Sequence, residues 1–85
     1  MIYKVEFSKP AEKQLQDIHG PDLKKIAKKI DKLATDPFMD GSEKLKGSED
    51  LFRIRQGDYR IIYSVFEKKL IILILKIGHR REVYR

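Results

Sequence analysis

The chain has 85 residues, enough for one domain with a modest core, and we expect a single domain over residues 1–85. It has no cysteine, which excludes disulfides and thiolate metal sites, and its two histidines, His19 and His79, lie too far apart in the sequence to indicate a metal site. The net charge of +6 comes entirely from the second half, because eight lysines through Glu43 are balanced by eight acids.

The first elements are a strand and a helix. Tyr3, Val5 and Phe7 alternate with polar residues, which predicts a strand with one buried face. Ser8 can cap a first helix, and Pro10 is tolerated in the first turn of a helix. The apolar face of this helix comprises Ala11, Leu15 and Ile18, and residues 19–21 are expected to end the helix.

A second helix follows, and its apolar stripe has the 3.6-residue period of an amphipathic helix. The stripe comprises Leu23, Ile26, Ala27, Ile30, Leu33 and Ala34. Five lysines of this segment are interleaved with Asp22 and Asp31, so we interpret them as a solvated surface rather than a binding site. A polar loop is expected from Met39 to about Asp50.

Three strands complete the predicted fold, at residues 51–56, 59–66 and 70–77. Gly57-Asp58 can make a two-residue hairpin turn between the first two. The third is an almost unbroken apolar run typical of a central strand, and Gly78 is expected to end it. The order β-α-α-β-β-β predicts an α+β fold with two N-terminal helices on one face of a small, mostly antiparallel four-stranded sheet.

The predicted hairpin turn sets the pairing register of its two strands, and this register places three arginines on one face of the sheet. If Gly57-Asp58 is the turn, Arg55 lies opposite Arg60 and Arg53 lies opposite Ile62. The three arginines then share the sheet face away from the helices. The opposite face is expected to pack on the helices through Phe52, Ile54, Ile61, Tyr63 and Val65, together with Ile71, Leu73 and Leu75. Like charges opposite each other destabilise a strand pair by roughly 0.2–1 kcal/mol, so a functional role for the cluster is favoured.

A structural explanation of the same charges is also possible. Basic residues are common on solvated sheet faces, and edge strands use charge to prevent aggregation. Lysine or mixed charges would serve that purpose equally well, but no Asp or Glu is expected near the three arginines on their face, and all six arginines of the chain lie after residue 52. Arginine binds phosphate with a planar fork of donors, so we expect an anion site for a nucleic-acid backbone.

The C-terminal segment 77–85 contributes further candidate residues. Arg80 and Arg81 add two guanidinium groups, while His79 and Tyr84 add groups that can carry protons or form hydrogen bonds. A basic C-terminus can equally be a frayed, solvated end. The longest apolar run, residues 70–75, is too short to span a bilayer, and no signal-peptide pattern begins the chain, so we expect a cytoplasmic protein.

The segments "LFRIRQGDYRIIYSV" and "IGHRREVYR", with "EKLKG" before them, resemble the RelE/ParE toxin superfamily and its RelE branch in particular. The resemblance covers almost the whole chain. It implies the toxin of a type II toxin–antitoxin system, an endoribonuclease that cuts mRNA in the ribosomal A site without a metal or another cofactor. It also implies an acidic, RelB-like antitoxin as partner, beside the ribosome and mRNA.

The resemblance also implies roles for single residues. Arg60 matches the phosphate-binding arginine, Arg80 the arginine that stabilises the transition state, and Tyr84 an aromatic residue that stacks on a base. Arg53 and Arg55 match two basic catalytic positions that are often lysines.

Further basic positions are expected to bind RNA or the ribosome: Lys46, Arg81 and Arg85. The implied reaction is attack of a ribose 2′-hydroxyl on the adjacent phosphate, which needs a proton acceptor and a proton donor. Arginine hardly deprotonates, so His79 is a hypothetical substitute for one of them.

Two other functions stay open on sequence grounds. ParE-type relatives share the fold but inhibit DNA gyrase, and a non-catalytic RNA-binding module would carry the same positive charge. Cleavage of ribosome-bound mRNA would separate the first function from both alternatives.

Overall fold

The computed structural model describes residues 2–47 and 50–79, which contain two helices and five strands. In chain order these are β1 (Lys4–Phe7), α1 (Lys9–Gln16), α2 (Gly20–Thr35), β2 (Glu43–Lys44), β3 (Leu51–Gln56), β4 (Tyr59–Phe66) and β5 (Ile71–His79). The strands form one sheet in the order β1-β5-β4-β3-β2, in which β1 runs parallel to β5 and the other neighbours are antiparallel. The predicted α+β class and element order are therefore confirmed.

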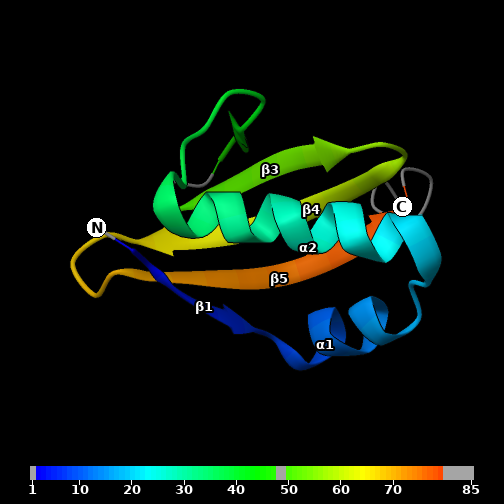
Figure 1. Cartoon of the computed structure of the whole chain (residues 1–85). Helices are drawn as coiled ribbons and strands as arrows, with labels where there is room; N and C mark the ends of the chain where they lie inside the picture. The colour runs from blue at the N-terminus through cyan, green and yellow to red at the C-terminus, as the bar shows by residue number, and fades with distance from the viewer. Residues whose placement is uncertain (1, 48–49, 80–85) are drawn as a thin grey trace.

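Both helices lie on the same side of the sheet, as predicted. Figure 1 shows α2 crossing in front of β3, β4 and β5, with α1 beneath it. The core lies between these layers and is made of residues with almost no exposed surface. Its largest fully buried members are Ile26, Leu33, Ile54, Ile61, Tyr63, Ile72, Ile74 and Ile77.

The sheet has one strand more than the sequence predicts. β2 pairs with β3 through Glu43 opposite Arg53 and Lys44 opposite Phe52. Two residues are too few to show an alternation of apolar and polar side chains, so this strand lay inside the predicted polar loop. It places an acidic side chain beside Arg53.

The apolar face of β5 is also different from the prediction. The expected inward residues were Ile71, Leu73 and Leu75, but Ile72, Ile74 and Ile77 are the buried ones. A register shift against β4 at Ile62/Tyr63 explains the uneven spacing, because one extra residue in β5 reverses the alternation between its two faces.

Gly78 does not end β5. The residue pairs with Arg60 of β4, and the strand continues to His79. A glycine in a strand interior is tolerated where it keeps its ladder partner, so glycine alone was a poor signal for the end of this strand.

The first helix is held by hydrogen bonds at both ends of its contact with the sheet. The Ser8 hydroxyl oxygen accepts from the Ala11 amide at 3.2 Å, which confirms the predicted cap, and its O–H donates to the Leu75 carbonyl at 2.8 Å. Gln14 accepts from the Ile77 amide at 2.7 Å. β1 ends opposite Ile74, so it offers no backbone partner to the next residues of β5. The side chains of Ser8 and Gln14 form hydrogen bonds with the backbone groups of β5 there instead.

The second helix begins earlier than its apolar stripe suggests. Gly20 has φ +67° and Pro21 follows it in the first turn, so residues assigned to the end of the first helix in fact start the second.

In the part of the chain that the structure describes, no helix is long and apolar enough to cross a membrane.

Tyr63 anchors the loop after α2 to the centre of the sheet. Its side chain is fully buried, and its hydroxyl donates to the Pro37 carbonyl at 2.8 Å. Its ring stacks on Phe52 with 5.8 Å between centroids. Burial raises the pKa of Tyr63 to about 12; a hydrogen bond with Ser42 opposes this rise, and the negative charge of Asp36 adds to it.

Candidate anion site on the open face of the sheet

The register of the β3–β4 hairpin is the one that the sequence predicts. Gln56 pairs with Tyr59, Arg55 with Arg60 and Arg53 with Ile62. Cross-strand partners point to the same face, and Ile54 and Ile61 point into the core, so the three arginines lie on the face away from the helices. The turn at Gly57, which has φ +60°, thus brings together arginines from two strands.

The three arginines line one hollow of about 330 Å³, together with Gly41 and Glu43. The three side chains differ in their exposure to solvent. Arg60 is only 3 % exposed, Arg53 is half-buried and Arg55 is exposed. A guanidinium keeps its charge when buried, and the lower local dielectric strengthens its attraction for an anion. This arrangement is suited to binding a phosphate from one side.

Glu43 belongs to the site, although no pattern in the sequence selects it. Its Oε2 accepts a hydrogen bond from Arg53 Nη2 at 2.7 Å. Arg53, first by this hydrogen bond and then by its charge, holds the pKa of Glu43 below its ordinary value, and Arg55 and Arg60 add to the effect. The prediction that no acid lies near the arginines on their face was therefore wrong. The prediction missed Glu43 because this residue lies in the two-residue strand β2, which is too short to show an alternation of apolar and polar side chains.

The remaining candidate residues lie apart from this hollow or outside the described residues. Lys46 is exposed in the loop after β2. His79 pairs with Tyr59 and contacts its ring edge-on at 5.7 Å, which places it on the helix-covered face, opposite the arginines. The structure therefore does not bring His79 to the arginine hollow. Outside the described residues lie Arg80, Arg81, Tyr84 and Arg85.

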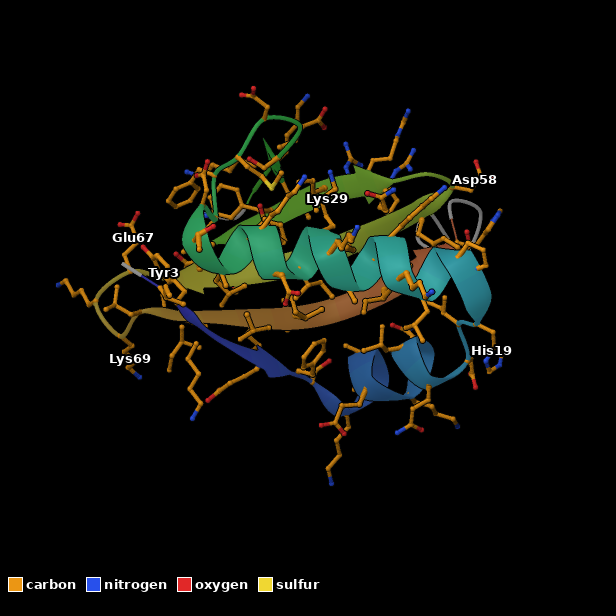
Figure 2. The ribbon with its side chains drawn as sticks, in the orientation of Figure 1. Tyr3, His19, Lys29, Asp58, Glu67 and Lys69 are labelled. Atoms are coloured by element: carbon orange, nitrogen blue, oxygen red, sulfur yellow. The ribbon has the colours of Figure 1, made fainter. Side chains whose placement is uncertain are left out.

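A larger hollow at the other end of the sheet has a different character. It measures about 430 Å³, and the aromatic rings of Phe38, Phe52 and Phe66 line it with two acids and two lysines. Figure 2 shows Glu67, on its rim, at the end of the molecule opposite Asp58 of the hairpin turn. Within residues 2–47 and 50–79, no three His, Asp or Glu side chains gather closely enough to hold a metal ion. Of these two hollows, the larger carries no net charge and the arginine hollow carries a net positive charge.

Known proteins share this fold and part of the sequence. Residues 5–84 match the family model described as "ParE toxin of type II toxin-antitoxin system, parDE". A relative from Methanocaldococcus jannaschii, described as "Putative toxin RelE1", is 35% identical over 100% of this chain and 98% of its own length. The protein named "mRNA interferase toxin RelE" from Escherichia coli K12 is 27% identical over 99% of this chain and 92% of its own length.

A solved structure shares both sequence and fold. The archaeal RelE–RelB complex from Pyrococcus horikoshii OT3 contains a chain that superimposes with a TM-score of 0.82 at 36% sequence identity. The match covers 94% of this chain and 97% of the other. The five-stranded sheet with two helices is therefore the fold of that complex's matching chain.

Proposed function

This chain belongs to the ParE/RelE family of toxins from type II toxin–antitoxin systems, and we propose that it is a ribosome-dependent endoribonuclease within that family. Its substrate is mRNA in the A site of a translating ribosome, and it acts in the cytoplasm as a single toxin domain. The name of the Escherichia coli relative, an mRNA interferase, supports the reaction class.

One observation carries the proposal. Arg53, Arg55 and Arg60 line a single hollow at the β3–β4 hairpin, on the face that the helices leave open. Three arginines that line one hollow can bind a phosphodiester and stabilise the extra negative charge of a pentacoordinate phosphorus. Opposed arginines destabilise a strand pair, and Glu43 offsets only part of their repulsion, so their placement supports a role in binding an anion.

The proposed reaction is an internal transesterification of the RNA. The ribose 2′-oxygen bonds to the adjacent phosphorus as its proton leaves, and the bond from phosphorus to the 5′-oxygen breaks. The 5′-oxygen takes a proton, which leaves a 2′,3′-cyclic phosphate and a 5′-hydroxyl end. No atom is gained or lost overall, and this chemistry does not require a metal.

Each residue has one role in this scheme. Arg60 binds the scissile phosphate, and Arg53 and Arg55 add fixed positive charge around it. Removal of a preorganised donor such as the buried Arg60 typically costs about 10²- to 10³-fold in rate. By family resemblance, Arg80 stabilises the transition state and Tyr84 stacks on a base. His79 has no role in the proposal, because it lies on the other face of the sheet.

We further propose an acidic, RelB-like antitoxin as the partner that blocks the site. The net charge of +6, all of it from the second half of the chain, suits association with a negatively charged segment. The Pyrococcus horikoshii relative, which was solved as a RelE–RelB complex, supports the same kind of partner.

The second candidate function is inhibition of DNA gyrase. The description of the matching family model names a ParE toxin, and ParE-type relatives inhibit gyrase. A non-catalytic RNA-binding module is the third. The two curated relatives described above carry RelE names, which favours the nuclease.

Programmed ribosomes separate the three functions. The purified protein is mixed with ribosomes stalled on a defined mRNA, and new 5′ ends are mapped by primer extension, while a parallel sample is tested for inhibition of gyrase supercoiling. Cleavage in the A-site codon without gyrase inhibition is expected. Gyrase inhibition with intact mRNA would favour the ParE function, and salt-sensitive RNA binding with neither activity would favour the binding module.

A further inference from the structure

One carboxylate occupies the arginine hollow. Glu43 lies opposite Arg53 in the β2–β3 pair, and its Oε2 is 2.7 Å from Arg53 Nη2. An RNA phosphate oxygen bound by the same guanidinium would need a similar position, because carboxylate and phosphate oxygens accept the same fork of donors. The acid therefore stands where part of an anionic ligand would bind.

The charge on this carboxylate opposes a second anion. The pKa of Glu43 is held below its ordinary value by Arg53 first and by the charges of Arg55 and Arg60, so the side chain is ionised at neutral pH. Three arginines and one glutamate leave the hollow with two net positive charges instead of three. A phosphodiester that enters it is attracted by the arginines and repelled by Glu43.

We propose that Glu43 is a specificity-determining residue: it competes with RNA phosphate for Arg53 and so weakens binding of RNA that a ribosome does not hold in place. The inference rests on the proposed nuclease function and adds a reason for its dependence on the ribosome. Ribosome-bound mRNA is presented at a high local concentration and in a fixed orientation, which overcomes the competition. Free RNA has neither advantage.

The local structure makes the carboxylate easy to displace. β2 is a two-residue strand at the edge of the sheet, and the Glu43 side chain is 66% exposed. Gly41 at φ +94° and Gly47 at φ +80° lie on either side of it. Short edge segments with few buried contacts move at low cost in free energy, so Glu43 can leave Arg53 when a phosphate binds while the hairpin with the arginines stays in place.

The experiment compares the wild type with Glu43→Gln, which removes the charge but keeps the size of the side chain. Glu43→Asp keeps the charge, and Glu67→Gln removes an equal charge at the other end of β4. Binding is measured by fluorescence anisotropy with a short single-stranded RNA whose 2′-hydroxyls are methylated, which prevents cleavage. The full chain is used throughout, and thermal denaturation checks that each variant is folded.

Glu43→Gln should bind this RNA roughly two- to tenfold more tightly than the wild type, and the slope of log affinity against log salt should steepen by about 0.7, as for one additional phosphate contact. The Glu43→Asp and Glu67→Gln variants should both bind like the wild type. With unmethylated RNA, the ratio of free to ribosome-bound cleavage should rise in Glu43→Gln by a similar factor.

Two results would overturn the inference. Unchanged or weaker RNA binding by Glu43→Gln would show that the carboxylate does not compete with phosphate. A tenfold or greater loss of cleavage on ribosomes in this variant, with RNA binding unchanged, would show that Glu43 serves the chemistry, for example as the proton acceptor for the 2′-hydroxyl. A wild type that leaves ribosome-bound mRNA intact would refute the proposed function, and the binding comparison would still decide the role of Glu43.

Discussion

The opposed arginines of the hairpin predict a trade-off between stability and activity. Arg55 and Arg60 are cross-strand partners, and both line the anion hollow. Arg55→Gln removes the exposed member of the pair but keeps a long polar side chain on β3. We expect this variant to be more stable than the wild type and less active as a nuclease. The reason is that the positive charges that repel each other in the folded protein also attract the phosphate of the RNA.

The magnitude follows from Coulomb's law. Two unit charges at about 5 Å repel by roughly 0.8 kcal/mol in water, and like charges opposite each other in a strand pair cost roughly 0.2–1 kcal/mol. Glu43 attracts Arg55 and offsets part of this repulsion. The expected gain is about 0.5 kcal/mol, which in a domain of this size raises the melting temperature by about 2–4 °C. Loss of one charged contact to phosphate should lower cleavage by roughly tenfold.

The assay is thermal denaturation at low and high salt, paired with cleavage on programmed ribosomes. Salt screens the repulsion, so the stability difference should shrink as the ionic strength rises. Lys68→Gln, at the β4–β5 turn, removes an exposed positive charge away from the cluster and should change neither property. A melting temperature at or below that of the wild type at low salt would refute the reasoning.

Three further changes test other parts of the structure. Tyr63→Phe removes the hydrogen bond to the Pro37 carbonyl and should cost about 1–2 kcal/mol at neutral pH. Burial raises the pKa of Tyr63 from 10.0 to about 12, so its contribution is complete below pH 10 and is lost as pH rises through 12. Urea denaturation should therefore show the wild type losing about 2–3 kcal/mol relative to Tyr63→Phe over that interval, and parallel pH curves would contradict this. Ser8→Ala removes a helix cap and a bond to β5 and should lower the free energy of unfolding by about 1–2 kcal/mol, also measured in urea; an unchanged value would mean that water replaces both bonds. His79→Ala should cleave ribosome-bound mRNA within roughly threefold of the wild type, and a hundredfold loss, typical of a missing acid or base, would contradict its placement on the helix-covered face.

The sequence predicted the elements whose local signals agree with one another. The hairpin register could be obtained residue by residue, because Gly57-Asp58 is flanked by two strands whose apolar alternation permits one pairing. That register also predicted the common face of Arg53, Arg55 and Arg60. The helix cap at Ser8 and the apolar stripe of α2 were also predicted correctly, because each depends on residues that are close together in the chain.

The features that the sequence could not predict depend on contacts between distant segments. The uneven spacing of Ile74 and Ile77 reflects a register shift against β4, which an unbroken apolar run conceals. Gly78 continues the strand because Arg60 pairs with it. Glu43 enters the site through a two-residue strand that exists only because β3 offers an edge. Its position beside Arg53 becomes visible only when the sheet is assembled.

The most direct test of the account is the effect of Arg60→Lys on cleavage. This variant keeps the positive charge but loses the planar fork of donors, and it changes the most deeply buried guanidinium of the hollow. Primer extension on programmed ribosomes should show cleavage reduced by about 100-fold or more, with thermal denaturation confirming that the variant is folded. A folded Arg60→Lys variant that cuts mRNA as fast as the wild type would contradict the claim that these arginines hold the scissile phosphate.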